Sequence, residues 1–208
     1  MKIILFDPET NGHHIKYASY LIRYLVDRGD IVTFITWKPC KLVSLIQNLP
    51  ITIKYIVGSS GENFGGNIIK RKWQLIKGLK YCFKLANVQQ ADIVHCLYFD
   101  YSEIPLYFCI KKYKRRSWKL FTTLFSPYFI HEPSEKVGFT RYFYHKLKCK
   151  IIVKLLKRGE INGLFTHSER IRKKLLDLCD NDSFCQNITV IPDPIEPLPK
   201  VSQKVARD

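Results

Sequence analysis

The sequence predicts an α/β domain built on a doubly wound, mostly parallel β-sheet. Short apolar runs alternate along the chain with segments in which apolar residues recur at helical spacing. Strands that alternate with helices favour parallel pairing, with the helices covering both faces of the sheet. The 208 residues, of which 46% are hydrophobic, are enough for one such domain with a core of its own.

Seven segments have the composition of strands. The first, residues 2–6, reads Lys-Ile-Ile-Leu-Phe, an apolar run typical of a strand buried on both faces of a parallel sheet. The others are apolar, and several are rich in β-branched residues, which favour the extended conformation. They cover residues 31–36, 51–57, 92–98, 119–124, 163–167 and 188–191.

The helix expected over residues 14–28 has the clearest periodicity. Ala18, Leu21, Ile22 and Leu25 are spaced i, i+3, i+4 and i+7, so they share one helical face. Gly29 follows at the position where a glycine commonly ends a helix. Further helices are predicted over residues 41–48, 69–86, 103–114, 139–158 and 169–178.

Two segments read as connections. Residues 58–67 are rich in glycine, serine and asparagine and predict a flexible loop. From Pro192, four prolines within eight residues indicate a stiff linker. The expected organisation is therefore one domain over residues 1–191, followed by a hinge over residues 192–208 that leads into a further domain.

The positive charge of the chain is concentrated in one region. The formal net charge is +16, and residues 111–158 hold fourteen lysines or arginines but only two glutamates. This region favours an anionic partner, namely a phospholipid surface, a phosphorylated substrate or nucleic acid, unless it is simply a solvated surface. No nucleic-acid-binding module is recognisable, so nucleic acid is not expected. The basic and apolar helix at 139–158 reads either as a packed crossover helix or as a helix lying on an anionic membrane.

The expected location is the cytoplasm, with peripheral attachment to the inner face of the membrane as the second option. No apolar run reaches the roughly 18 residues of a spanning helix, and the apolar residues 3–6 are followed at once by Asp7 and Glu9. The seven cysteines form no C-x-x-C pair and lie mostly in apolar segments, so we expect free thiols without a zinc site or disulfide framework. No metal and no cofactor are expected.

Ligands of parallel sheets bind beyond the carboxyl ends of the strands, which directs attention to the loops there. In the first loop, Gly12 lets the backbone approach a ligand, and the start of the next helix favours an anion such as a diphosphate. His13 and His14 are substrate-binding candidates; adjacent residues on a helix point about 100° apart and do not easily share a metal. The dinucleotide and phosphate-loop fingerprints are absent. The alternative is an ordinary tight turn.

The fourth strand supplies a substrate-binding candidate, His95, and the segment that follows it supplies the candidate bases. His95 lies near the carboxyl end of this strand, although a histidine in an apolar strand is more often a core residue. Asp100 and Glu103 are the carboxylates best placed to accept a proton, or else they cap the next helix. Ser126 lies after the fifth strand, where no nucleophile elbow supports a serine hydrolase.

Several motifs, in this order, resemble the GT-B-fold glycosyltransferases, in particular the large retaining family 4, also called group 1. The resemblance covers nearly all of the chain. The matching segments are Lys2–Phe6 with Gly12-His13-His14, Arg28-Gly29-Asp30-Ile31-Val32-Thr33, Ala91-Asp92-Ile93-Val94-His95, Phe165-Thr166-His167-Ser168-Glu169, Val190-Ile191-Pro192-Asp193-Pro194 and residues 202–207.

The resemblance implies a Rossmann-like N-terminal half of a GT-B fold, with the donor-binding domain beginning after the hinge and otherwise absent. It implies transfer of a sugar from a nucleotide-sugar donor to a glycan, lipid or small-molecule acceptor, without a metal and with retention of configuration. Gly12 and His13 would lie near the donor diphosphate or the acceptor, and His95, Asp100 and Glu103 would face the cleft. Ser126 and Ser168 complete the expected substrate contacts.

One departure from the family concerns the segment after the fifth strand. Many members carry a histidine there, whereas this chain has Thr-Thr-Leu-Phe-Ser over residues 122–126. The residues 1–208 alone are expected to be inactive, because the donor site belongs to the other domain. The alternative function is a non-catalytic module that binds an anionic membrane surface or a partner protein through residues 111–158.

Overall fold

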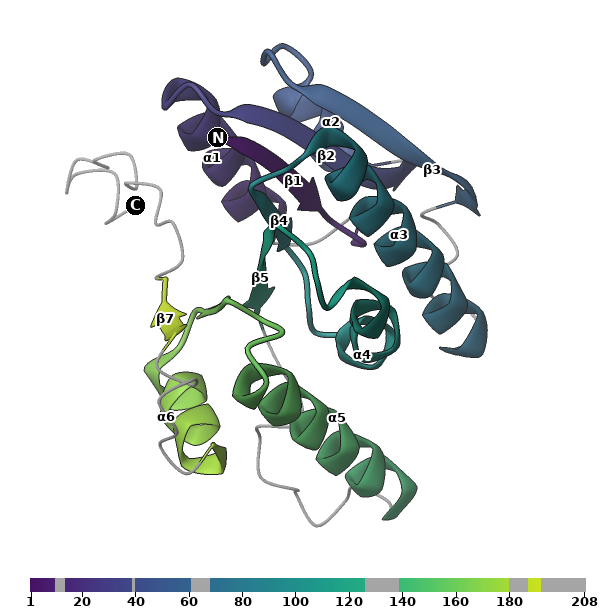
Figure 1. Ribbon diagram of the computed structural model, residues 1–208, viewed down its shortest axis with the longest axis vertical. Coiled ribbons are helices and arrows are strands. Elements are labelled where there is room, and N and C mark those ends of the chain that lie inside the picture. The colour runs from purple at the N-terminus through teal and green to yellow at the C-terminus, as the bar shows by residue number, and fades with distance from the viewer. Residues whose placement is uncertain (10–13, 39, 61–67, 126–138, 180–186, 192–208) are drawn as a thin grey trace, which may run out of the picture.

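A computed structural model describes residues 1–9, 14–38, 40–60, 68–125, 139–179 and 187–191. Within them the chain forms a single seven-stranded sheet in which all neighbouring strands are parallel, in the order β3-β2-β1-β4-β5-β6-β7 (Figure 1). The strands are β1 (Lys2–Phe6), β2 (Ile31–Lys38), β3 (Thr52–Ser60), β4 (Ile93–Cys96), β5 (Lys119–Leu124), β6 (Gly163–Thr166) and β7 (Ile188–Val190).

Helices cover both faces of the sheet, as the alternating pattern predicts. Ile4 and Phe6 of β1 belong to a core shared with four of the helices, whereas Ile3 and Leu5 belong to a second core shared with the other two. The first group is α3 (Ile68–Gln89), α4 (Glu103–Ile110), α5 (Phe139–Lys157) and α6 (Glu169–Leu178). The second group is α1 (His14–Asp27) and α2 (Lys41–Ile46).

The predicted fold class and every predicted element are confirmed, with shifts at element ends. β3 continues to Ser60, so the prediction of a loop is wrong for residues 58–60; residues 61–67 lie outside the described part. Helix α4 ends at Ile110 and continues into a short 3-10 helix over Lys111–Tyr113. The predicted boundary at 191/192 adjoins residues 192–208, which also lie outside the described part.

Gly29 ends helix α1 in the way its position predicts. Its φ of 81° lies in the left-handed region, which is open to glycine because glycine has no Cβ. The Gly29 N–H donates to Val26 O at 2.8 Å, and the Asp30 N–H donates to Leu25 O at 3.0 Å. These two bonds satisfy the last carbonyls of the helix as in a Schellman motif and turn the chain into β2.

The segment Ala91–His95 has a structural role at the start of the sheet. The Asp92 carboxylate accepts a hydrogen bond from the Lys2 N–H at 2.7 Å, and the Asp92 N–H donates to Lys2 O at 2.9 Å. Its carbonyl accepts the Lys119 N–H at 2.9 Å. One aspartate therefore aligns the first residues of β1, β4 and β5.

Gly78 allows α3 to approach the sheet closely. A Cβ at this position would lie 2.8 Å from Phe6 Cζ and 3.1 Å from the Trp37 ring, and both of these side chains are fully buried. We expect Gly78→Ala to lower the free energy of unfolding by about 1–2 kcal/mol, because overpacking outweighs the gain in helix propensity. Urea denaturation measures the change. Lys80→Ala, on the exposed side of α3, is the control, and an alanine at position 78 that stabilises the protein would contradict the close packing.

Among the described residues, the cysteines follow their predicted state with one exception, and Cys185 lies outside them. Cys40, Cys82, Cys96, Cys109 and Cys149 are free thiols. Cys179 is in a disulfide, so the expectation of free thiols throughout is wrong at this position. Among the described helices, none combines the length and apolar character needed to cross a bilayer.

Candidate functional site

The carboxyl ends of β1, β4, β5 and β6 lie at one edge of the sheet, because the strands are parallel. Asp7 follows β1 and is fully buried. Its N–H donates to Ile35 O at 3.0 Å, and its carboxylate accepts the Glu9 N–H at 3.0 Å. Asp7 therefore holds the first residues of the loop that leads toward Gly12 against the edge of the sheet.

Four aromatic rings meet at this edge and form an aromatic cluster of Tyr17, Tyr98, Phe125 and His167. The Phe125 and His167 rings stack with centroids 4.4 Å apart, and Tyr17 stands edge-on to both, at 5.5 and 5.2 Å. Tyr98 stacks on Phe125 at 5.7 Å. The rings come from α1 and from the segments that follow β4, β5 and β6, so the parallel sheet brings distant parts of the chain together. Tyr17 and Phe125 are buried within the cluster, whereas Tyr98 and His167 are half-buried and form its accessible part.

Asp100 links two of the loops at the edge. It is buried, and its Oδ2 accepts the Phe125 N–H at 3.0 Å. Its carbonyl oxygen accepts a hydrogen bond from Lys148 Nζ at 2.7 Å. Asp100 thus positions Phe125 of the aromatic cluster and connects it to helix α5.

A buried ionic cluster lies beside this loop, formed by Lys72, Glu103 and Lys148. The three residues come from α3, α4 and α5. Lys148 Nζ lies 2.9 Å from Glu103 Oε1, and the two side chains are 7% and 0% exposed. Lys72 Nζ donates to Tyr101 O at 2.6 Å. The cluster therefore joins the three helices that cover this end of the sheet.

Burial shifts the protonation of the cluster. It raises the pKa of Glu103 to about 7, against the attraction of Lys148 and Lys72 for the ionised carboxylate. It lowers the pKa of Lys72 to about 8, against the attraction of Glu103. Taking a charge out of water disfavours the ionised form of either group. Because both pKa values lie near neutrality, the charge of the cluster responds to modest changes in pH.

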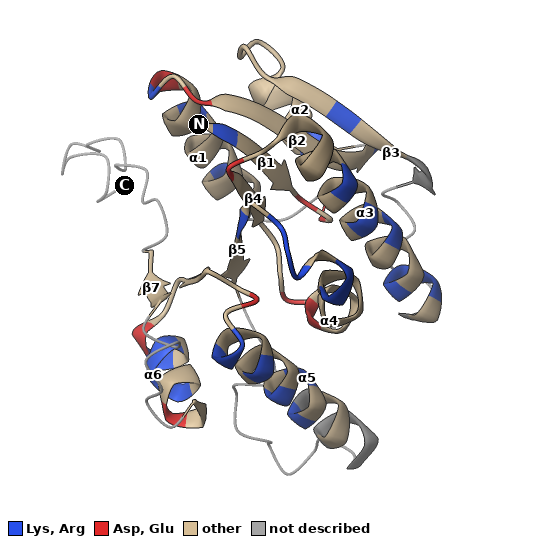
Figure 2. Cartoon of the chain, viewed as in Figure 1, with Lys and Arg blue, Asp and Glu red and all other residues tan. Residues whose placement is uncertain are grey.

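Cations and tyrosines surround the ionic cluster. The Arg71 guanidinium lies 3.8 Å from the centroid of the Tyr101 ring and 3.5 Å from Glu9 Oε2. Lys148 Nζ lies 5.5 Å from the ring centroids of both Tyr101 and Tyr144. Lysines and arginines recur along α3, α5 and α6, and an acidic segment marks the start of α4 (Figure 2). This region is therefore rich in positive charge.

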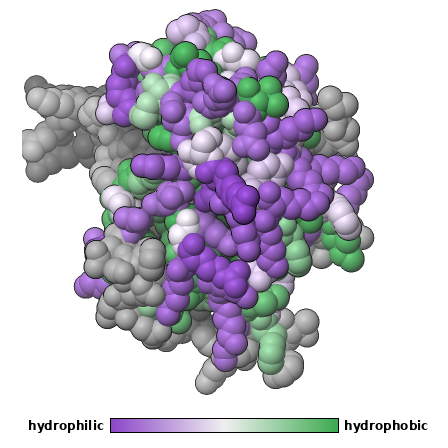
Figure 3. All heavy atoms as spheres, viewed as in Figure 1, coloured by the Kyte–Doolittle hydropathy of each residue, from purple (hydrophilic) through white to green (hydrophobic). Residues whose placement is uncertain are grey.

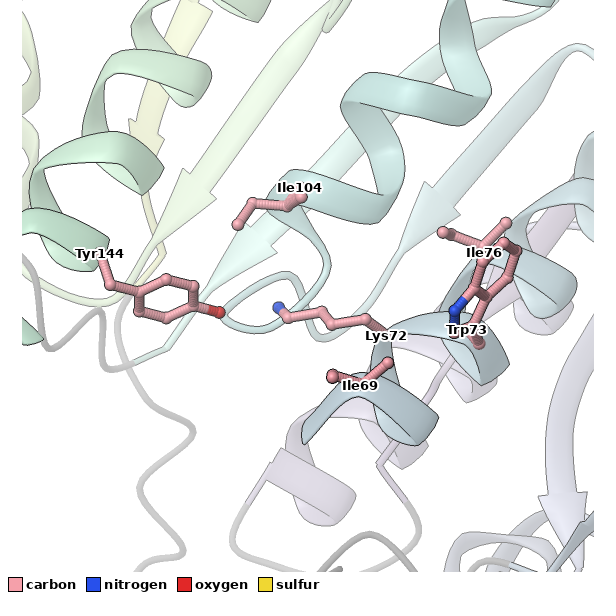
Figure 4. Close-up of a pocket in the computed structure, with 6 residues that line it drawn as sticks. All are labelled: Ile69, Lys72, Trp73, Ile76, Ile104 and Tyr144. Atoms are coloured by element: carbon pink, nitrogen blue, oxygen red, sulfur yellow. The ribbon is translucent and has the colours of Figure 1, made fainter. Parts of the chain in front are cut away.

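A pocket of about 220 Å³ opens between α3, α4 and α5, next to the ionic cluster. It is lined by Ile69, Lys72, Trp73, Ile76, Ile104 and Tyr144. Figure 4 shows the Lys72 side chain extending from α3 toward the Tyr144 hydroxyl on α5. The exposed surface of the pocket is almost entirely apolar, and the Lys72 ammonium group beside it is bonded to Tyr101 O.

The histidine and carboxylates that the sequence nominates occupy buried positions. His95 is 6% exposed, with Nε2 2.8 Å from Thr123 Oγ1 and its ring beside Phe121 and Phe165. Burial lowers its pKa to about 3, so the ring is neutral at physiological pH. Glu103 is the first residue of α4. These positions fit the alternative interpretations, namely a core histidine and a first-turn acid. Substrate binding by His95 and a role as a base for Asp100 or Glu103 remain predictions.

The other nominated residues do not meet in the described part of the chain. Gly12, His13 and Ser126 lie outside it. His14 is the first residue of α1. Ser168 is the N-cap residue of α6 and is half-buried. Among the described residues, no group of three or more histidines, cysteines, aspartates or glutamates is placed to hold a metal ion.

Sequence reasoning did not identify the aromatic cluster, the role of Asp7, or Lys72 and Lys148. For the two lysines the sequence does contain a signal. Lys72 continues the stripe of α3 that buries Leu75, Leu79 and Cys82, and Lys148 continues the stripe of α5 that buries Ile151, Ile152 and Leu155. A lysine in line with buried positions is unusual, because isolated charges are rarely buried.

No protein-family model matches the sequence, and no curated protein matches it. Solved structures do match its fold. A UDP-glucosyltransferase from Polygonum tinctorium aligns with a TM-score of 0.59 and 11% identity, over 96% of this chain and 54% of that one. A UGT transferase from Siraitia grosvenorii, in complex with UDP, aligns with a TM-score of 0.56 and 13% identity, over 99% of this chain and 54% of that one. HepE from Anabaena, in complex with UDP-glucose, aligns with a TM-score of 0.55 and 10% identity, over 94% of this chain and 44% of that one.

The chain spans about half the length of the structures that it matches. At identities this low, the likeness concerns the fold. The chain has the Rossmann-like α/β fold of about half of each of these proteins, which confirms the predicted fold class.

Proposed function

We propose that the chain is the N-terminal domain of a GT-B glycosyltransferase that transfers a sugar from a nucleotide-sugar donor to an acceptor. The observation that supports this most is the extent of the structural match. Nearly all of the chain superimposes on about half of proteins whose names or bound molecules involve UDP or UDP-glucose. The ordered motifs of the sequence favour the retaining family 4 type, without a metal.

In this proposal the acceptor and donor meet above the carboxyl edge of the sheet, between this domain and a donor-binding domain. The acceptor hydroxyl oxygen bonds to the anomeric carbon as the bond from that carbon to the diphosphate oxygen breaks. The nucleoside diphosphate leaves, and the hydroxyl proton passes to a base. The half-buried Tyr98 and His167 of the aromatic cluster are the rings that a sugar can contact, while Asp7 and Asp100 hold the segments around them.

The proposed substrate contacts from this chain are Gly12, His13, Ser126, His14 at the start of α1, His95 of β4, and Ser168 at the start of α6. Glycine and a helix start are suited to a diphosphate, because backbone N–H groups are available there. Asp100 and Glu103 are the carboxylates that the sequence nominates as the base; both are buried in the domain by itself, and Asp100 is expected to act by positioning Phe125. The donor-binding domain is supplied in cis or by a separate chain.

The test of the proposal is sugar transfer from a panel of nucleotide-sugars. We expect no transfer by residues 1–208 alone, and transfer from one class of donor when the same chain is joined to, or mixed with, its donor-binding domain. Release of the nucleoside diphosphate and mass spectrometry of the acceptor measure it. Robust turnover by residues 1–208 alone would contradict the two-domain arrangement, and failure of the complete protein with every donor would contradict the transferase.

Attachment to an anionic membrane is the second candidate function, and α5 supplies the observation for it. Its residues Ile151, Ile152, Leu155 and Leu156 are buried, which identifies α5 as a packed crossover helix. Phe143 and Leu147 nevertheless remain 57% and 49% exposed, next to the exposed Lys146 and Lys150. The face in view in Figure 3 is mainly hydrophilic, with hydrophobic residues in small patches. Flotation with anionic vesicles that is reversed by salt would support this function.

A further inference from the structure

The segment between β4 and α4, residues 97–102, follows the carboxyl edge of the sheet. The Leu97 N–H donates to Phe6 O of β1, and the Phe99 N–H donates to Thr123 O of β5, both at 2.9 Å. Leu97 and Phe99 are buried. The segment therefore lies against the ends of the two strands that flank β4.

Tyr98 and Tyr101 are half-buried rings of this segment. Their centroids lie 5.8 Å apart, and Tyr98 also stacks on Phe125 of the aromatic cluster at 5.7 Å. An aromatic ring adds to binding most where it is held in one position, because a ligand then meets it without a cost of ordering. The backbone on either side of Tyr98 determines that position.

Two lysines hold this backbone through adjacent carbonyl groups. Lys148 Nζ on α5 donates to Asp100 O at 2.7 Å, and Lys72 Nζ on α3 donates to Tyr101 O at 2.6 Å. Lys148 is itself kept in place by Glu103, whose Oε1 lies 2.9 Å from its Nζ. Bonds from an ammonium group are stronger than bonds between neutral groups. Two successive peptide groups are thus fixed from two different helices.

We propose that Lys72 and Lys148 are positioning residues of the transferase, which hold Tyr98 where the acceptor contacts it. This inference rests on the proposed function and adds the reason why this ring is kept in place. Neither lysine touches the substrate, because the Lys148 side chain is 7% exposed and Lys72 Nζ is turned to Tyr101 O. Both act through the backbone next to Tyr98 and through Tyr101, which packs against it.

The burial of the two ammonium groups supports a positional role. Burial lowers the pKa of Lys72 to about 8, because the charged form is disfavoured away from water. Apolar side chains commonly replace buried ionic groups at little cost in stability. An apolar side chain cannot donate to Asp100 O or Tyr101 O, so these two bonds are what lysine adds at positions 72 and 148.

Amide hydrogen exchange of the 208-residue chain measures the positioning without any substrate. Lys72→Met removes the donor to Tyr101 O. We expect the hydrogen-bonded Ser102 and Phe125 N–H groups to exchange about tenfold faster, whereas those of β1 and β2 exchange as in the parent chain. Lys72→Arg retains a donor and should keep exchange slow. Lys77→Met, at an exposed position of the same helix, is the control.

Lys148 is tested in the same way near pH 5. Glu103 is mostly protonated there, because burial raises its pKa to about 7, so Lys148→Met does not leave a buried carboxylate unpaired. The same two N–H groups, of Ser102 and Phe125, should again exchange about tenfold faster. Lys150→Met, an exposed lysine of the same helix, is the control.

Kinetics of the complete protein test whether the position matters for the acceptor. We expect Lys72→Met to raise KM for the acceptor about three- to tenfold, the scale of one aromatic contact. KM for the donor and kcat should stay within about twofold of the parent. Tyr98→Leu should raise the acceptor KM at least as much. The double variant should be no worse than Tyr98→Leu alone, because Lys72 acts through this tyrosine.

The two parts of the proposal can fail separately. Exchange that becomes faster in β1 and β2 as much as in the segment would show that Lys72 only stabilises the domain, and would overturn the positioning role. Transfer by the complete protein with an unchanged acceptor KM in Lys72→Met would overturn the role in acceptor binding, while the transferase stands. If the complete protein transfers no sugar from any donor, the proposed function and the acceptor contact fail together, and exchange alone decides whether the lysines hold the segment.

Discussion

Replacing Lys148 by methionine is expected to lower the free energy of unfolding by about 3–5 kcal/mol near pH 8, the cost of removing one partner of a buried ion pair. The variant leaves the Glu103 carboxylate fully buried without the ammonium group that lies 2.9 Å away in the parent protein. Lys72 is the remaining lysine that attracts this carboxylate. Urea denaturation of the two proteins measures the difference.

The cost should depend on pH in a defined direction. The pKa of Glu103 in the folded protein is raised to about 7, above its ordinary value of 4.5. The folded state therefore binds this proton more tightly than the unfolded state, and this group makes the protein less stable as the pH rises through the interval between the two values. Near pH 5 Glu103 is mostly protonated with or without Lys148. We expect the loss caused by Lys148→Met to fall there to less than half.

Two further variants test the cause. Lys150→Met removes an exposed lysine from the same helix and should change stability by no more than about 0.5 kcal/mol. The double variant Glu103→Met, Lys148→Met should recover most of the loss, since hydrophobic residues commonly replace buried ion pairs at little cost. A loss that is equal near pH 5 and pH 8, or a double variant as unstable as the single one, would show that packing and not charge determines the effect.

Most strands could be located from the sequence, because the apolar composition that marks a buried strand is a property of that segment alone. The parallel strands β1 and β5 are buried along most of their length, so each strand begins and ends where the sequence pattern does. β3 lies at the edge of the sheet, and its last residues Gly58–Ser60 have turn composition, so local preference gave the wrong answer there. The pairing of β2 with β3 is irregular between Thr36 and Lys38. Beyond it Lys38 pairs with Ser60, so β3 continues to that residue.

The buried ionic cluster could not be predicted in the same way, because it depends on how three helices meet. Lys72 and Lys148 are 76 positions apart, and although each is in line with buried positions of its helix, the spacing does not show that they meet at Glu103. Glu103 is identifiable as an acid at the start of a helix, but its burial follows from the packing of α4 between α3 and α5. The aromatic cluster likewise draws rings from four segments that only the sheet brings together.

Substituting Asp100 separates a positioning role from a catalytic one. We expect Asp100→Ala to lower the free energy of unfolding by about 2–3 kcal/mol, because the buried Phe125 N–H loses a charged acceptor at 3.0 Å. Asp100→Asn keeps a side-chain oxygen that can accept this bond, so its loss should be below about 1 kcal/mol. Denaturation curves measure both, and near-ultraviolet circular dichroism reports whether the rings around Phe125 keep their packing.

The asparagine variant also decides how Asp100 acts in the proposed transferase. A base that accepts the acceptor proton contributes about 10²–10⁴-fold to the rate, and asparagine cannot replace it. Since Asp100 is buried and its carboxylate holds the Phe125 backbone, we expect Asp100→Asn in the complete protein to retain turnover within about tenfold of the parent. Asp100→Ala should lose more, because the loop that carries Phe125 is released. A stable asparagine variant whose turnover falls by about a thousandfold or more would instead establish Asp100 as the base.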